Sequence, residues 1–85
     1  MDKIIEELKS LIKPEMDKLD IILDSILWIE ESKNNYTLKV ILDKVNGIDL
    51  DTIVEATNII NPILDEKDLI KEQYTLEVSS KERGN

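Results

Sequence analysis

The sequence contains no cysteine and no histidine, and it has few glycines, prolines and aromatic residues. Without cysteine the chain can form no disulfide, no thiolate nucleophile and no zinc–thiolate site. Without histidine it lacks the commonest general base and the commonest metal ligand. No apolar run approaches the roughly 20 residues that cross a bilayer, and no secretory signal is recognisable. Most classes of enzyme are therefore excluded. We expect a cytoplasmic protein that needs no cofactor, membrane or small-molecule substrate.

What remains is the composition of one small folded domain. Of the 85 residues, 41 % are hydrophobic and 35 % are charged, which is too apolar for a disordered chain and too charged for a membrane span. The formal net charge is −8, from 19 acidic residues against 11 basic ones. A protein that grips phosphate backbones unaided usually carries a basic surface. The acidic balance favours a basic protein as the partner.

Hydrophobic spacing predicts a helix followed by a hairpin in the first half of the chain. An amphipathic helix is expected over residues 2–18, with a kink or a break at Pro14, which has no N–H to donate. The runs 21–30 and 36–43 predict two antiparallel strands. The first run is apolar on both faces, which is consistent either with a central strand or with a bulge that switches the faces.

The second half predicts one more helix and one more strand. Asp49 or Asp51 caps a helix that runs to about Leu64, and residues 74–79 form the last strand. The positions expected on the apolar face of this helix are Leu50, Ile53, Val54, Thr57, Ile60 and Leu64. The order is αββαβ, an α+β fold in which a two-layer sandwich has both helices on one face of a small three-stranded mixed sheet.

The αββαβ order resembles that of RNA-binding modules of the KH type II class. Those modules clamp a nucleic-acid backbone with a Gly-x-x-Gly loop. That loop cannot form here, because the only glycines are Gly47 and Gly84. Of the three aromatic residues, Tyr36 and Tyr74 fit packing roles, whereas Trp28 lies on a strand that is apolar on both faces and remains open to a stacking role.

Charge is distributed unevenly along the chain. Residues 20–31 carry four acids and no base, and residues 49–68 carry six acids against one lysine. The hairpin supplies the only clearly basic stretch, with Lys33, Lys39 and Lys44 as candidate RNA contacts. Solvation of a helix explains many charge runs, but the near absence of bases from two separate segments favours an acidic docking face.

No pattern of residues supports catalysis. Asp49 and Asp51 precede an apolar-periodic run, so helix capping explains them better than a metal site, and no calcium-loop spacing surrounds them. Ser79 and Ser80 have no histidine to activate them as nucleophiles.

Four blocks of the sequence resemble the amino-terminal domain of the RimP family of bacterial ribosome maturation factors. The most specific block resembles the family pattern Y-x-L-E-V-S-S, and its matching residues are Tyr74, Leu76, Glu77, Val78, Ser79 and Ser80. The other three are Leu11-x-x-Pro14 followed by Leu19, Leu23 through Trp28, and Leu38 through Asp43 with Gly47 through Asp51.

Three departures from the family pattern are visible. Asp20 stands where the family usually has glycine, and Lys81 and Glu82 stand where it has Pro-Gly. The second, barrel-like domain of the family has no counterpart. Residues 1–80 are therefore expected to form the RimP-like domain, with 81–85 as a polar tail, in a chain that is either cut at the domain boundary or naturally short.

The resemblance implies a monomeric assembly factor that binds the immature small (30S) ribosomal subunit and assists its late maturation. The implied partner is a basic protein, number twelve of the small subunit, with rRNA nearby. The acidic stretches suit such a partner, and the expected docking residues are Asp49, Asp51, Glu55, Asp65, Glu66 and Asp68. Glu77, Ser79 and Ser80 would set the geometry of the interdomain junction. Two alternatives remain: direct RNA binding by the three hairpin lysines, and sequestration of an unrelated basic partner.

Overall fold

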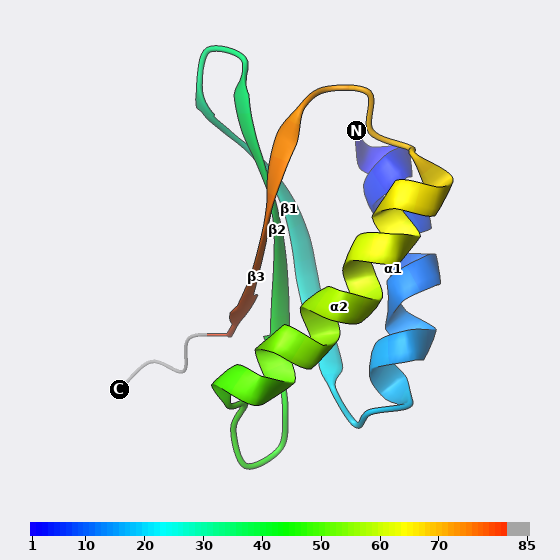
Figure 1. Cartoon of the computed structure of the whole chain (residues 1–85), viewed down its shortest axis with the longest axis vertical. Coiled ribbons are helices and arrows are strands. Elements are labelled where there is room, and N and C mark those ends of the chain that lie inside the picture. Colours follow the sequence, from blue (N-terminus) through cyan, green and yellow to red (C-terminus); the bar gives the residue numbers. More distant parts are fainter. Residues whose placement is uncertain (82–85) are drawn as a thin grey trace.

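Two helices cover one face of a three-stranded sheet, and the other face of the sheet is open (Figure 1). The computed structural model describes residues 1–81, so of the expected tail only Lys81 is described and 82–85 lie outside the described residues. The elements in chain order are α1 (Asp2–Asp17), β1 (Ile22–Ser32), β2 (Asn35–Asp43), α2 (Leu50–Lys67) and β3 (Tyr74–Ser80). The predicted αββαβ sandwich is confirmed.

β2 is the central strand of the sheet. The strand order is β1-β2-β3, with β1 antiparallel and β3 parallel to β2. The parallel pair requires a crossover, and α2 supplies it by carrying the chain back along the sheet. Leu38, Val40 and Leu42 of β2 are all completely buried, which fits a strand with neighbours on both sides and helices above it. The expectation of a central first strand is therefore wrong, because β1 lies at the edge.

A bulge explains why β1 is apolar on both faces. Leu23 pairs with Leu42 and Ser25 pairs with Ile41, so Asp24 is the extra residue between them. Across a bulge the alternation of side chains shifts by one position. Leu23 consequently joins the helix-facing side of the strand and packs against the core. The bulge alternative is confirmed.

The core lies between the sheet and the two helices. Each helix contributes three fully or almost fully buried side chains, which are Leu8, Ile12 and Met16 from α1 and Ala56, Ile60 and Leu64 from α2. The break expected at Pro14 is wrong, because α1 is a single unbroken helix from Asp2 to Asp17. A proline in the last turn removes only one of its hydrogen bonds. In the described part of the chain, neither helix combines the length and the hydrophobicity that a membrane crossing requires.

The second helix departs from its predicted apolar face. Leu50 is 76 % exposed and Val54 is 51 % exposed, although both were expected to be buried. A helix can bury only one stripe against a sheet. In α2 that stripe passes through Ala56, Ile60 and Leu64. Ile53 still packs against the core, whereas Leu50 and Val54 face solvent. The helix also continues past Leu64 to Lys67.

α1 ends in a Schellman motif that contains Asp20. The Ile21 N–H donates to the Met16 carbonyl at 3.0 Å, and the Asp20 N–H donates to the Asp17 carbonyl at 3.1 Å. Met16 and Ile21 are both buried, which supplies the hydrophobic contact of the motif. The motif requires a left-handed residue, and Asp20 has φ 59°. This geometry gives a physical reason for a glycine at that position.

We predict that Asp20→Gly stabilises the domain by up to about 1 kcal/mol, because glycine adopts the left-handed conformation without a Cβ clash. The gain is limited by the greater freedom of glycine in the unfolded chain. Urea unfolding monitored by circular dichroism measures the change. The matched control is Glu7→Gly in the middle of α1, which should lose about 1 kcal/mol. Equal losses of unfolding free energy in the two variants would contradict the Schellman motif assigned at Asp20.

Candidate protein-binding surface

Asp49 caps the amino terminus of α2. Its carboxylate Oδ1 accepts hydrogen bonds from the Thr52 N–H at 2.8 Å and from the Thr52 hydroxyl at 2.6 Å. These bonds to the ionised form lower the pKa of Asp49, the hydroxyl bond having the larger effect. The capping interpretation of Asp49 is confirmed. Asp51 lies in the first turn, where a negative charge favours the helix dipole.

The two helices differ in whether their acidic residues form ion pairs. On α1, three carboxylates are neutralised by lysines one turn away, in the pairs Glu6–Lys9, Asp17–Lys13 and Glu15–Lys18. On α2, the exposed carboxylates of Asp51, Glu55, Asp65 and Glu66 form no ion pair within the described residues 1–81. The negative charge of α2 is therefore uncompensated, and that of α1 is mostly balanced locally.

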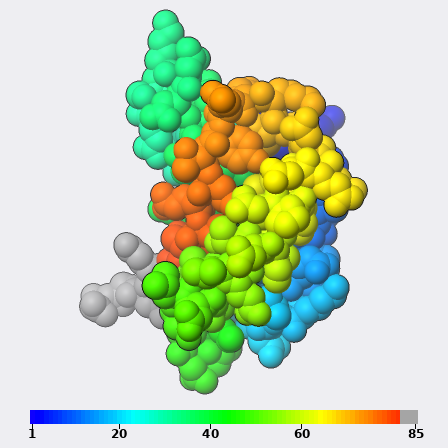
Figure 2. Space-filling view, viewed as in Figure 1, coloured from blue at the N-terminus to red at the C-terminus, as the bar shows by residue number. Residues whose placement is uncertain are grey.

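The four unpaired carboxylates form one surface, which we name the α2 acidic surface and define as Asp51, Glu55, Asp65 and Glu66. Their spacing of four and ten or eleven residues corresponds to about one and three helical turns, so they share the side of α2 opposite its buried stripe. Asp65 lies at the edge of that side and also lines a cleft against β3. That side lies on the exterior of the molecule, where α2 runs from green to yellow (Figure 2). Of the other two predicted docking residues, Asp49 is engaged in the cap, and Asp68 lies beyond the helix and pairs with Lys71 at 3.6 Å.

The three candidate RNA-binding lysines do not form a patch. Lys33 lies in the turn that joins β1 to β2, and Lys44 follows the opposite end of β2. A strand of this length separates them by roughly 30 Å. Lys39 lies between them and pairs with Glu77 of β3 at 3.5 Å. The positive charge of the hairpin is thus dispersed and partly neutralised.

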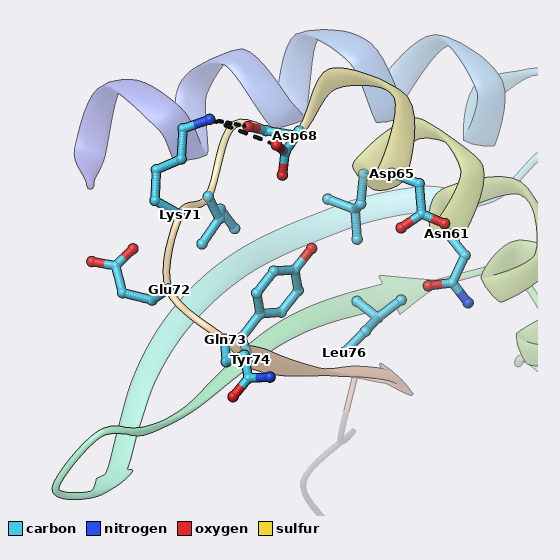
Figure 3. A pocket seen from close by; sticks show the side chains of 10 residues that line it. Asn61, Asp65, Asp68, Lys71, Glu72, Gln73, Tyr74 and Leu76 are labelled. Atoms are coloured by element: carbon cyan, nitrogen blue, oxygen red, sulfur yellow. Dashed lines mark hydrogen bonds and ion pairs between the residues drawn. The ribbon is translucent and has the colours of Figure 1, made fainter.

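A cleft of about 440 Å³ lies between the carboxyl end of α2 and the start of β3 (Figure 3). Asn61, Asp65 and Asp68 line it from the side of α2, and Tyr74 and Leu76 line it from β3. The Tyr74 ring belongs to an aromatic cluster on the helix-facing side. Trp28 stacks on Tyr36 with ring centroids 4.9 Å apart and meets Tyr74 edge-on at 5.9 Å. The packing interpretation of the two tyrosines is confirmed, and it includes Trp28.

Burial raises the pKa of Tyr74, and the negative charges of Asp65 and Asp68 raise it further. An acid whose pKa is higher in the folded state stabilises the fold fully below its unfolded pKa, here about 10, and loses that contribution as pH rises above it. We predict that the phenol titrates above pH 10 and that stability declines over the same range. Absorbance titration of a Tyr36→Phe variant isolates Tyr74. Adding Asp65→Asn and Asp68→Asn should lower its midpoint, and an unchanged midpoint would contradict the electrostatic cause.

The last strand pairs with β2, and the residue that follows it also contacts β1. Tyr74, Leu76 and Val78 pack against the core. Just beyond the strand, the Lys81 N–H donates to the Leu42 carbonyl at 2.6 Å, and its ammonium group lies 3.1 Å from the Asp24 carboxylate in the bulge of β1. A proline at position 81 could form neither bond. Sequence reasoning missed this link, because no local pattern connects residues that meet only across three strands.

These features define a small α+β domain of αββαβ order whose most distinctive surface is an acidic helix. Residues 11–81 match the family model described as the RimP N-terminal domain. Because this match covers most of the chain, the chain belongs to the RimP family, whose members are ribosome maturation factors that act on the small ribosomal subunit. The matched range contains the whole α2 acidic surface and β3. The resemblance found in the sequence is confirmed.

Proposed function

We propose that this chain is a cytoplasmic, non-enzymatic assembly domain that binds the immature 30S subunit and docks the α2 acidic surface on a basic ribosomal protein, number twelve of that subunit, beside rRNA. The observation that carries the proposal is the row of unpaired carboxylates along the outer side of α2. Residues 1–80 form the domain and act as a monomer. Glu77, Ser79 and Ser80 lie at the end of the domain from which the chain departs and would orient a following domain.

Electrostatic attraction between α2 and a basic partner would drive the proposed docking. The uncompensated carboxylates steer a basic partner towards α2 and raise the rate of encounter, and salt screens this attraction over about 10 Å at 0.1 M ionic strength. Direct contact with phosphates is disfavoured on this face, because it would bring like charges together. The proposed partner is therefore a protein, and rRNA contacts are confined to the surroundings of the docking site.

Co-sedimentation of the 85-residue chain with free small subunits, at low and at moderate salt, tests the proposal. We expect binding to free subunits that weakens with salt and is absent on whole ribosomes, where the maturation site is complete. Whole ribosomes serve as the matched control for non-specific adsorption. No binding at either salt concentration, or equal binding to whole ribosomes, would contradict the proposal.

A further inference from the structure

Two aliphatic side chains are exposed at the amino-terminal end of α2. Leu50 and Val54 lie one turn apart and are 76 % and 51 % exposed. They lie on the same helical stripe as Asn61 and Asp65, which line the cleft against β3. α2 begins at the same end of the molecule as β3 ends (Figure 1), so the exposed pair lies at that end. Contiguous exposed apolar side chains that are rimmed by polar residues are typical of interaction sites.

The charges beside the pair restrict what can cover it. Asp51 and Glu55 each follow one member of the pair in the sequence, so they occupy the adjoining stripe, and neither is ion-paired within residues 1–81. RNA and anionic lipid are disfavoured, because both would bring phosphates against these carboxylates. A second copy of the chain is disfavoured too. A two-fold interface places each patch against itself, and two side chains bury far less than the roughly 800 Å² per partner of a stable complex.

We infer that Leu50 and Val54 are the apolar anchor of the docking surface and that they receive an aliphatic side chain of a basic polypeptide segment, whose lysines or arginines meet Asp51 and Glu55. This inference rests on the proposed function and assigns separate roles to neighbouring residues. Apolar contacts at the centre of an interface carry most of its energy, and charges at its rim set the rate and the salt dependence.

The experiment compares three variants in binding to free small subunits at low and moderate salt. Leu50→Gln with Val54→Thr removes the apolar anchor with little effect on the fold, since both side chains are exposed. Ile22→Thr is the matched control, because Ile22 is 48 % exposed but lies on β1. Asp51→Asn with Glu55→Gln removes the adjoining charges. Thermal unfolding, followed by the fluorescence of Trp28, checks that all three variants fold.

We expect the anchor variant to bind about tenfold more weakly at both salt concentrations, the control to bind as the unaltered chain does, and the charge variant to lose affinity mainly at low salt. If the unaltered chain binds and the anchor variant binds equally well, this inference is overturned and the proposed function stands. If the unaltered chain does not bind free small subunits, both the inference and the proposed function are contradicted. A dimer in sedimentation equilibrium that the anchor variant abolishes would also overturn the inference, by assigning the pair to a second copy.

Discussion

Leu38→Ala should remove most of the stability of the domain. Leu38 is completely buried in the central strand, where it pairs with Trp28 of β1 and with Leu76 of β3. Truncating a buried leucine costs about 2–5 kcal/mol, because the cavity cannot collapse fully. Single domains are stable by only about 5–15 kcal/mol, and small domains lie towards the lower end. The variant should therefore melt on the order of 10–30 °C below the unaltered chain.

Chemical unfolding followed by circular dichroism measures this loss, and Leu27→Ala is the matched control. Leu27 is the neighbour of Trp28 in the sequence, but it lies on the open face of the sheet and is 42 % exposed. Its truncation should cost less than about 1 kcal/mol, since much of the side chain already contacts water. Comparable losses in the two variants would mean that the core does not lie between the sheet and the helices.

Reversing charges on the α2 acidic surface should have the largest effect on binding. Glu55→Lys, Asp65→Lys and Glu66→Lys together replace three uncompensated negative charges with positive ones. Each attraction to a basic partner becomes a repulsion, so we expect affinity for free small subunits to fall at least about tenfold at low salt. The difference should shrink as salt is raised, because the charges are exposed.

The control for charge reversal changes the same number of charges elsewhere. Glu7→Lys, Glu30→Lys and Glu31→Lys give the same net charge but place it on α1 and at the hairpin end of β1. If the α2 acidic surface docks the partner, this variant keeps its affinity. If the hairpin binds RNA, this variant binds more tightly and the α2 variant is unimpaired, which would contradict the proposed docking site.

The regular elements could be predicted from the sequence, because their signals are local. The alternation of Leu38, Val40 and Leu42 identified a half-buried strand, and Asp49 before an apolar run identified the start of a helix. Both signals depend on residues within one or two turns of each other. Every predicted element is present, and the ends differ by at most about three residues, as frayed or extended ends usually do.

The remaining features depend on which side of an element meets the rest of the molecule. α2 has enough apolar residues for two overlapping stripes, and periodicity cannot choose between Val54 and Ala56 as the buried one. The choice is made by the sheet, against which the small Ala56 side chain fits. In the same way, the pair Lys81–Asp24 and the pair Lys39–Glu77 arise only from the strand order. The predicted acids lie along α2, but their lack of partners was visible only in three dimensions.

Site-specific photo-crosslinking can identify what the outer side of α2 contacts on the subunit. A photoreactive amino acid at Asn58 lies on the outer side of α2 between Glu55 and Asp65, and one at Asn34 lies in the hairpin turn beside Lys33. Both asparagines are exposed, so neither replacement should disturb the core. On free small subunits, we predict that position 58 crosslinks to a basic ribosomal protein and that position 34 gives little product. Crosslinks to rRNA from position 34, with none to protein from position 58, would contradict docking through α2.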